Sequence, residues 1–351
     1  MMGFDDFARA YTGFFKVLTL ELGLKCPITC RHCCYNCSPD RVEEVDSEIM
    51  KSAIQQFSEI ETSEIVALTG GEPFAYPGLL ETALEEVTRF PRLKSVVISN
   101  GFWATSQEKA RDTLENLPPI HQLCLSTDVY HNEFIPLAFI KHAILACEAL
   151  DIPMFLEVCI EPEDSFQGTL KKALGNDLYE RTFRLSTSVQ PIGRGMDLNI
   201  TPKRERNNVL WDSCFMAGSP FVLYDGTVVT CCNCTRLRGM ASKSMSDMCG
   251  SPLEMGRISQ SKLQDIFLEM NKDMILQALR TMGVGGILKL LAETGTYPKG
   301  GPSYSHVCDL CIALLTDPHI VSRLRGLLTS QSYVEEIALK RAYYYGEAIE
   351  G

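Results

Sequence analysis

Apolar and polar residues alternate in the stretch that begins at Lys16. Every second residue from Leu18 to Leu24 is a leucine, and this two-residue period predicts a β-strand. After a cysteine-rich loop, Asp46 can cap a helix. The apolar residues of that helix recur at helical spacing, at Ile49, Met50, Ala53, Ile54, Phe57 and Ile60. The first unit is therefore a strand, a loop and a helix.

The same order of strand and helix returns five more times. Apolar runs at 65–68, 95–99, 122–126, 153–160 and 182–189 predict further strands, with helical patterns between them. Strand starts at intervals of about 30 residues are typical of repeated βα units, and therefore of a parallel sheet. Because such folds carry their functional groups on loops at the carboxyl ends of the strands, these loops are the place to look for chemistry.

The pattern changes after about residue 206. Residues 221–229 predict a β-hairpin that turns at Asp225-Gly226. Apolar residues then indicate a long helical region over 259–291, and a last helix is expected over 330–348. We expect two domains, an α/β barrel portion over residues 1–205 and a smaller extension over residues 206–351.

Composition narrows the classes of function. Hydrophobic residues at 45% and charged residues at 22% are typical of a globular protein, and the net charge of −11 offers no field that would attract nucleic acid. The sequence has no apolar run of 18 residues and no basic region of a secretion signal at its start. We expect a cytoplasmic protein that binds neither nucleic acid nor a membrane. Because a reducing compartment does not keep disulfides, its 15 cysteines indicate metal ligands, catalytic groups or buried thiols.

Three cysteines stand together directly after the first strand. Cys26, Cys30 and Cys33 are separated by three and then two residues. Three thiolates on one loop can hold three irons of a [4Fe–4S] cluster and leave the fourth iron open to an outside ligand. Zinc is the chemical alternative, but structural zinc sites take four protein ligands, typically as two separated pairs. The spacing favours iron and sulfur.

This CxxxCxxC spacing, after the first strand of a βα repeat, resembles the radical S-adenosylmethionine (SAM) enzymes. The resemblance implies a partial, TIM-like (β/α)6 barrel that carries the cluster at its top, with a flavodoxin- or ferredoxin-type protein as the reductant. In the family, the open iron binds the amino and carboxylate groups of SAM, and an electron from the cluster cleaves SAM to a 5′-deoxyadenosyl radical. Carried over, Cys26, Cys30 and Cys33 are the cluster ligands, and His32 takes the place of the aromatic residue that touches the adenine.

The second strand ends in Gly70-Gly71-Glu72-Pro73, which matches the GGEP motif of the family. Without side chains, Gly70 and Gly71 let the backbone approach a ligand, and Glu72 offers an acceptor for an ammonium group. The resemblance therefore assigns these three residues to SAM binding.

Other strand ends match the family less specifically, and their polar residues can equally serve to close a strand. Further candidates for SAM binding are Asn100, Ser126 and Arg194. Asp128 and Glu157 are candidate catalytic residues at the fourth and fifth strand ends.

Four more cysteines surround the predicted hairpin or follow it. Cys214 and Cys231 flank the hairpin, and Cys308 and Cys311 form a later CxxC pair. Four thiolates saturate a second [4Fe–4S] cluster, and the arrangement resembles the auxiliary-cluster extensions called SPASM and, in a shorter form, Twitch. Because no CxxCx5Cx3C series follows Cys231, we expect one auxiliary [4Fe–4S] cluster, with a zinc site as the alternative.

Cys232 is a candidate hydrogen-atom donor. Successive side chains of an extended strand point in opposite directions, so Cys232 would face a substrate if Cys231 faced the auxiliary cluster. A thiol in that place can give a hydrogen atom to a substrate radical, which is the step that produces epimerisation. An inert thiol is the alternative.

The resemblance favours an enzyme that abstracts a hydrogen atom from a ribosomally synthesised peptide and then epimerises or cross-links it. Only 25 residues precede Cys26, too few for the N-terminal recognition domain of many peptide-modifying relatives. A dehydrogenase of a small molecule such as an aminocyclitol is the second reading, because the four later cysteines resemble those of such enzymes. A non-catalytic iron–sulfur or zinc protein is the third, but it would not need the Gly-Gly-Glu turn.

Overall fold

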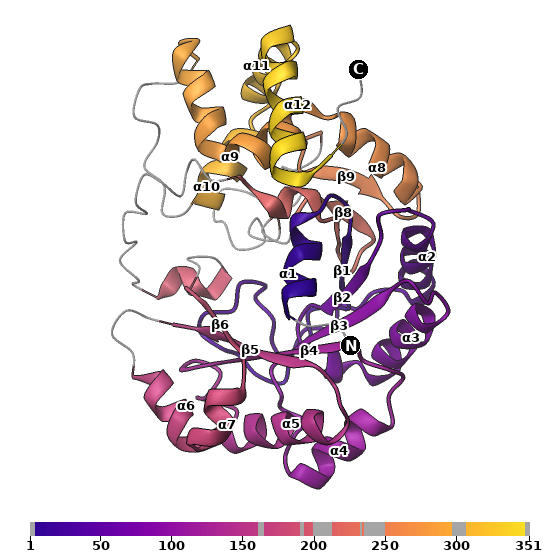
Figure 1. Ribbon diagram of the computed structural model, residues 1–351, viewed down its shortest axis with the longest axis vertical. Coiled ribbons are helices and arrows are strands. Elements are labelled where there is room, and N and C mark those ends of the chain that lie inside the picture. The colour runs from indigo at the N-terminus through magenta and orange to yellow at the C-terminus, as the bar shows by residue number, and fades with distance from the viewer. Residues whose placement is uncertain are drawn as a thin grey trace.

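The computed structural model describes residues 4–160, 165–189, 193–198, 213–231, 234, 250–296 and 307–347 (Figure 1). Its strands are β1 (Val17–Glu21), β2 (Ile65–Thr69), β3 (Lys94–Ser99), β4 (Gln122–Asp128), β5 (Met154–Cys159), β6 (Arg184–Thr187), β7 (Phe221–Val222), β8 (Thr227–Val229) and β9 (Glu254–Arg257). They form one sheet in the order β6-β5-β4-β3-β2-β1-β7-β8-β9. Neighbours from β1 to β6 are parallel, so the predicted α/β fold with six parallel strands is confirmed. Among the strands of the described residues, β6 and β9 stand at the two edges and the sheet does not close on itself.

Helices follow the strands as the sequence pattern predicts. In the parallel part they are α2 (Ser47–Ser58), α3 (Pro77–Thr88), α4 (Gln107–Glu115), α5 (Leu137–Ala149), α6 (Phe166–Leu174) and α7 (Asn176–Arg181). Figure 1 shows them along the outer side of the curved sheet. The other helices are α1 (Phe4–Thr12), α8 (Leu263–Lys272), α9 (Met274–Glu293), α10 (Val307–Leu315), α11 (Pro318–Leu328) and α12 (Gln331–Tyr345). Short 3₁₀ turns are η1 (Pro73–Ala75), η2 (Gly193–Asp197) and η4 (Phe215–Gly218).

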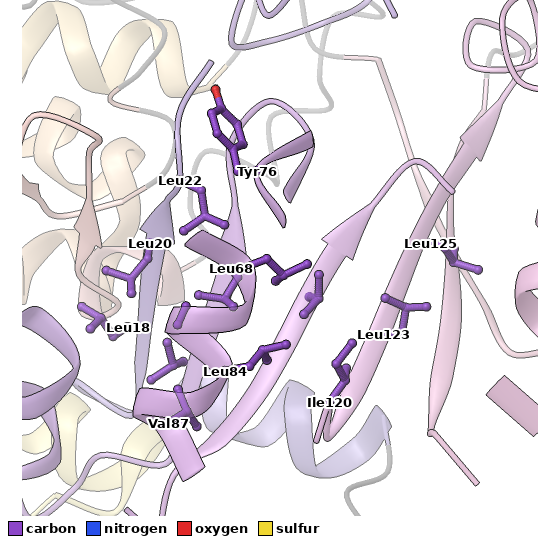
Figure 2. Packing of buried hydrophobic residues seen from close by; sticks show 14 of the residues in the cluster. Leu18, Leu20, Leu22, Leu68, Tyr76, Leu84, Val87, Ile120, Leu123 and Leu125 are labelled. Atoms are coloured by element: carbon purple, nitrogen blue, oxygen red, sulfur yellow. The ribbon is translucent and has the colours of Figure 1, made fainter. Parts of the chain in front are cut away.

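Leucines on the outer face of the parallel strands form the main core with the covering helices. Figure 2 shows Leu18, Leu68 and Leu123, from three strands, on the same face as Leu84 and Val87 of α3. The predicted alternation in β1 is therefore confirmed, and the polar residues of β1 are left for the inner face. The inner face is free to carry chemistry because the outer face supplies the apolar contacts.

The hairpin extends the same sheet. β7 pairs with β1 in parallel, with Thr19 beside Phe221 and Leu20 beside Val222, while β8 and β9 continue antiparallel. The turn at Asp225-Gly226 occurs as predicted, with Gly226 at a φ of 80°. The proposed boundary at residue 205 lies outside the described residues, so the division into two domains stays a prediction.

The long helix expected over 259–291 is two helices. Asp273 ends α8 and starts α9, because its carboxylate accepts hydrogen bonds from Ile275 N and Leu276 N. A second departure lies inside α9, where Gly283 has a φ of 65° and kinks the helix. The last predicted helix is present as α12, but α10 and α11 were not predicted.

Within the described ranges, α9 is the helix that is long and apolar enough to cross a membrane by length and composition. Of its most apolar window, 72% is buried inside the protein. The buried Arg280 of this helix donates hydrogen bonds to Gln277 and Glu347. Apolar residues all around a helix are typical of a helix packed in a protein core.

Candidate active site

The cysteine loop joins β1 to α2, and its two ends lie side by side. A β-bridge pairs Lys25 with Ser38, and Cys26 N donates to the Ser38 carbonyl oxygen over 3.1 Å. The chain between these points folds inward, so that Cys26 and Cys30 are buried and Cys33 is partly buried. The structure thus places the three predicted cluster ligands on one anchored loop at the carboxyl end of β1.

The thiols of this loop form a hydrogen-bonded group. Cys30 donates to the sulfur of Cys33, and this contact lowers the pKa of Cys33 and raises the pKa of Cys30. Burial raises the pKa of Cys26 to about 12, and Asn100 Nδ2 lies 3.5 Å from the Cys26 sulfur as a donor. Cys33 is therefore held toward the thiolate form, which is the form that binds soft metals.

The two glycines after β2 bring that strand end against the cysteine loop. Gly71 N donates to the Gly23 carbonyl oxygen over 2.8 Å, and Glu72 N donates to that of Lys25 over 3.0 Å. A Cβ atom on Gly70 would lie 2.5 Å from the Gly23 carbonyl oxygen, and Gly70 also has a φ of 130°. The close contact with the cysteine loop thus explains why positions 70 and 71 are glycines. That their backbone also contacts a ligand stays a prediction.

Glu72 is almost fully buried, at 1% exposure, and its carboxylate is already engaged. It accepts hydrogen bonds from Ser99 Oγ at 2.8 Å, from Asn100 N at 2.7 Å and from Phe74 N at 3.1 Å. A carboxylate has about four acceptor sites, so these three bonds leave one for a ligand. Burial raises the pKa of Glu72 to about 7.

Asp128 at the end of β4 holds two histidines. Its Oδ2 lies 2.8 Å from His131 Nδ1 and 3.1 Å from His32 Nε2. Burial alone would raise the pKa of Asp128, but the hydrogen bonds from His131 and His32 outweigh it and lower that pKa well below the usual range. Burial alone would lower the pKa of His131. The hydrogen bond to Asp128 has the larger effect, so the pKa of His131 is raised. The His32 ring also stacks on Tyr130, with 4.7 Å between the centroids.

Two buried nitrogens beside the loop lack a hydrogen-bond partner within the described part of the chain. They are His32 Nδ1 and Arg194 Nη2. Buried polar atoms are normally satisfied, so an unsatisfied pair at one place indicates room for a polar ligand.

Arg194 and Gly193 reach the cysteine loop from the far end of the barrel. Arg194 Nε donates to the Cys30 carbonyl oxygen over 2.9 Å, and Arg194 N donates to that of Cys33 over 3.1 Å. A Cβ atom on Gly193 would lie 2.3 Å from the Cys33 carbonyl oxygen. Gly193 and the predicted Arg194 therefore support the backbone that carries two of the three thiols.

The fourth and fifth strands place further predicted residues on one face. Ser126 lies beside Glu157, and Asp128 lies beside Cys159, in parallel register. Burial raises the pKa of Glu157, whose Oε2 is 3.9 Å from Cys124 Sγ. Glu157 and Cys159 lie two residues apart on β5 and therefore share one face of the strand, and burial favours the protonated form of Glu157.

A set of potential metal-binding atoms lies on the same side of the barrel. His32, Asp128 and Cys159 each contribute one potential ligand atom, and these three atoms lie within 4.8 Å of one another. At this separation one metal ion could bind all three. His32 and Asp128 were predicted separately as site residues, and their grouping with Cys159 depends on the fold. Histidine, carboxylate and thiol together suit zinc or iron.

Three of the four later cysteines pack against a second hydrophobic core beside the hairpin. Cys214 precedes η4 and Cys231 follows β8; both pack with Cys311 of α10 around a second hydrophobic core. Burial, with the nearby Cys231 thiol adding to it, raises the pKa of Cys214 to about 12. Cys308 lies on α10 one turn before Cys311. Cys234, which is not among the predicted ligands, also lies here, with its sulfur 3.8 Å from that of Cys231. Its CxxC spacing from Cys231 was the available signal.

Cys232, the candidate hydrogen-atom donor, lies outside the described residues. His131 is the main residue at the barrel site that the predicted set omitted. Its position three residues after Asp128 was the available signal, because a helical turn places such residues on one side.

Three comparisons relate this chain to known proteins. The family model described as the radical SAM superfamily matches residues 20–142. The putative peptide biosynthesis protein YydG of Bacillus subtilis (strain 168) is 25% identical over 166 residues, which cover 46% of this chain and 51% of that protein. The match thus spans about half the length of this curated relative.

Solved structures share the fold at low identity. Native anSMEcpe with bound AdoMet and Cp18Cys peptide matches with a TM-score of 0.51 and 12% identity over 89% of this chain and 99% of that chain. BtrN in complex with AdoMet and 2-DOIA matches with a TM-score of 0.45 and 17% identity over 78% of this chain and 89% of that chain. The first of these supports the partial barrel.

Proposed function

Residues 20–142 of this chain are a radical SAM domain, and we propose that the chain uses it to remove a hydrogen atom from a peptide substrate. The predicted family is thereby confirmed, and a [4Fe–4S] cluster and SAM are the cofactors of its chemistry. Together they supply a 5′-deoxyadenosyl radical when bound. The observation that carries the proposal is the contact between the three-cysteine loop and the Gly-Gly-Glu turn inside this domain.

In this proposal Cys26, Cys30 and Cys33 hold the cluster. The donor set fits, because the three thiols lie on one anchored loop and one of them is stabilised as a thiolate. Thiolates are the usual ligands of iron–sulfur clusters. Three protein ligands leave one iron open for the amino and carboxylate groups of SAM.

The residues around the loop fit a polar cofactor. Glu72 keeps one acceptor site for an ammonium group. Two buried nitrogens can bind further polar atoms: His32 Nδ1 as a donor or an acceptor, and Arg194 Nη2 as a donor. We assign Gly70 and Gly71 to the docking of the turn on the loop. We assign the remaining polar strand ends, Asn100 and Ser126, to the SAM pocket.

Asp128 and Glu157 are the candidate catalytic residues of the inner face. Asp128 orients His32 and His131 by accepting a hydrogen bond from each. Glu157 has a raised pKa, so it can carry a proton and donate it to a substrate carbonyl oxygen. Neither residue creates the radical, and both would bind and orient the substrate.

The later cysteines fit one auxiliary [4Fe–4S] cluster. Cys214, Cys231, Cys308 and Cys311 supply four thiols, and three of them pack around one core. Four thiolates saturate a cluster and leave no iron open, so this group would exchange electrons or line the substrate pocket rather than bind SAM. Zinc in the same site is the alternative, and metal analysis decides between them.

The peptide substrate is supported by the printed name of YydG, a putative peptide biosynthesis protein. Epimerisation with Cys232 as the hydrogen-atom donor, or cross-linking, are the two proposed outcomes. Dehydrogenation of a small molecule such as an aminocyclitol remains the rival, on the spacing of the four later cysteines. A flavodoxin- or ferredoxin-type protein is the proposed reductant.

Anaerobic reconstitution tests the function. The reduced, iron-loaded protein is incubated with SAM and with peptides encoded by neighbouring genes, and 5′-deoxyadenosine and peptide mass are measured. Uptake of one deuteron from heavy water at an α-carbon, lost in Cys232→Ala while deoxyadenosine still forms, supports epimerisation. A peptide lighter by two hydrogens supports a cross-link. Modification of an aminocyclitol and of no peptide would overturn the substrate proposal.

A further inference from the structure

The side-chain amide of Asn100 contacts one of the three predicted cluster ligands directly. Asn100 follows β3, and its Nδ2 donates a hydrogen bond to the Cys26 sulfur over 3.5 Å. Both residues are buried, with Asn100 at 6% and Cys26 at 5% exposure. A thiol sulfur is a weak acceptor, but hydrogen bonds to an ionised acceptor are about twice as strong as those between neutral groups. The contact therefore becomes stronger when Cys26 is a thiolate.

The local backbone determines which end of the Asn100 amide faces the sulfur. Asn100 Oδ1 accepts a hydrogen bond from Phe102 N over 3.0 Å. A backbone N–H can only donate, so the amide oxygen must face Phe102 and the amide nitrogen must face Cys26. The donor is thus aimed at the sulfur by a turn that the chain forms by itself.

Hydrogen bonds also hold the backbone of Asn100. Asn100 N donates to Glu72 Oε2 over 2.7 Å, and Ser99 Oγ donates to Glu72 Oε1 over 2.8 Å. Trp103 Nε1 donates to Ser99 Oγ over 3.0 Å. The strand end that carries the amide is therefore fixed on the carboxylate that the proposed function assigns to the ammonium group of SAM.

Closing a turn does not account for the whole Asn100 side chain. An asparagine that closes a turn uses its oxygen, and Nδ2 is a separate donor. Within the described ranges, the hydrogen-bond partner of this nitrogen is the Cys26 sulfur. Asn116 at the end of α4 differs, because it is exposed and its Nδ2 donates to the Asp112 carbonyl oxygen of its own helix. The amide of Asn100 instead joins two segments that are far apart in the sequence.

We propose that Asn100 raises the reduction potential of the radical SAM cluster by donating a hydrogen bond to the sulfur of Cys26. The inference rests on the proposed function, in which Cys26 holds this cluster. On reduction the cluster takes up one electron from the flavodoxin- or ferredoxin-type protein, and no covalent bond changes. Hydrogen bonds to the sulfurs are among the factors that set the potential of an iron–sulfur cluster. A donor stabilises the added negative charge, so it favours the reduced state.

The consequence for the reaction is an easier first step. With the hydrogen bond in place, a weaker reductant suffices to reduce the cluster, and without it the same reductant leaves more of the cluster oxidised. Asn100 acts through Cys26, so it is a positioning residue for the donor and not a catalytic residue.

The first test measures the midpoint potential of the cluster without SAM, so that contacts with SAM do not contribute. Wild type, Asn100→Ala and Asn100→Ser are titrated with reductant and followed by electron paramagnetic resonance. The signal of this cluster is the one that a triple variant of Cys26, Cys30 and Cys33 lacks. Serine can accept the bond from Phe102 N and keep the turn, but it is too short to reach Cys26.

We expect both variants to have a lower potential than wild type. The loss of one hydrogen bond to a charged group predicts about a tenfold shift in the reduction equilibrium, which is about 59 mV for one electron. Asn116→Ala is the matched control and should keep the wild-type potential. Unchanged potentials in both Asn100 variants would overturn the proposal. A wild-type potential in Asn100→Ser with a lowered one in Asn100→Ala would also overturn it, because the turn and not the amide would then be responsible.

The second test begins with wild type, so it does not depend on how well a variant binds iron. The protein is made with asparagine that carries ¹⁵N in the side chain only, and the reduced cluster is studied by pulsed electron paramagnetic resonance. We expect a weak coupling to a ¹⁵N nucleus that is absent from Asn100→Ser. The absence of this coupling in wild type contradicts the proposal. A coupling that persists in Asn100→Ser comes from another asparagine and contradicts it as well.

The proposed function has a separate readout. If wild type forms 5′-deoxyadenosine but the Asn100 variants keep its potential, only the present inference fails. If wild type forms none, the proposed function fails.

Discussion

Gly71 lies so close to Lys25 that a Cβ atom at position 71 would stand 2.0 Å from the Lys25 carbonyl oxygen. This contact joins the turn after β2 to the loop that carries the three cysteines. Because the obstructing atom belongs to the backbone, no side-chain rotation can relieve the overlap. The position of the cysteine loop therefore depends on the absence of a side chain at this residue.

Gly71→Ala should displace the cysteine loop and lower the free energy of unfolding. We expect a loss of about 1–3 kcal/mol, the usual cost of forcing extra volume into a packed site, together with reduced iron content after reconstitution. Gly78→Ala is the matched control, since nothing lies within 4 Å of a Cβ atom there. Thermal unfolding and iron analysis measure both effects, and equal behaviour of the two variants would contradict the role of Gly71.

Asp128→Asn should reverse the shift in the pKa of His131. With its carboxylate partner removed, burial dominates, so this pKa should fall from above the ordinary value of about 6.5 to below it. NMR titration of the imidazole rings measures the change. A His131 pKa that stays above the ordinary value in Asp128→Asn would contradict the role of the carboxylate.

The same ion pair sets a window of stability. The raised pKa of His131 contributes stability fully below about pH 6.5, and this is lost as the pH rises through the folded value. The lowered pKa of Asp128 contributes stability above about pH 3.9, and this is lost as the pH falls through its folded value. The stability difference between wild type and Asp128→Asn should therefore be largest between these two values. A difference that does not vary with pH would refute the pairing.

Glu72 should make the protein less stable as the pH rises, whereas a carboxylate with a lowered pKa makes it more stable. Burial raises its pKa to about 7, whereas the unfolded value is about 4.3. The folded state holds the proton more tightly, so stability is lost as the pH rises from about 4.3 to 7, by about 4 kcal/mol. Denaturant unfolding of the metal-free protein should show this loss in wild type and not in Glu72→Gln. The same dependence of stability on pH in both proteins would contradict the raised pKa of Glu72.

The auxiliary site makes a prediction about iron content. Cys231→Ala should lower it from about eight to about four irons per chain, as expected when one of two [4Fe–4S] clusters is lost. Cys234→Ala should keep about eight, because four other thiols already complete the auxiliary site. Loss of about four irons in Cys234→Ala would instead show that Cys234 is a ligand. Zinc found in the wild-type protein would show that the site holds zinc and not an auxiliary cluster.

Local patterns predicted much of the fold. The alternation around Leu18 and the runs that became β2 to β6 could be read from the sequence because each strand has one face against a helix. The Asp225-Gly226 turn was likewise a local signal. The break at Asp273 was not seen, since a capping aspartate inside a long apolar run resembles any surface aspartate until its backbone partners are known.

Contacts between distant segments were not available from the sequence. The parallel pairing of β7 with β1 joins residues about two hundred positions apart, and no local period encodes it. The spacing of Cys26, Cys30 and Cys33 indicated a cluster, but the hydrogen bond from Cys37 to Cys33 depends on how the loop closes. The partners of Glu72 and the two histidines on Asp128 depend in the same way on neighbouring strands.

The most direct test of the account is the formation of 5′-deoxyadenosine by the reduced, iron-loaded protein incubated with SAM in the absence of oxygen. The account predicts that wild type forms it and that the triple variant Cys26→Ala, Cys30→Ala, Cys33→Ala forms none while keeping its folded structure. A wild-type protein that contains zinc and no iron, or a triple variant with full activity, would contradict the central claim.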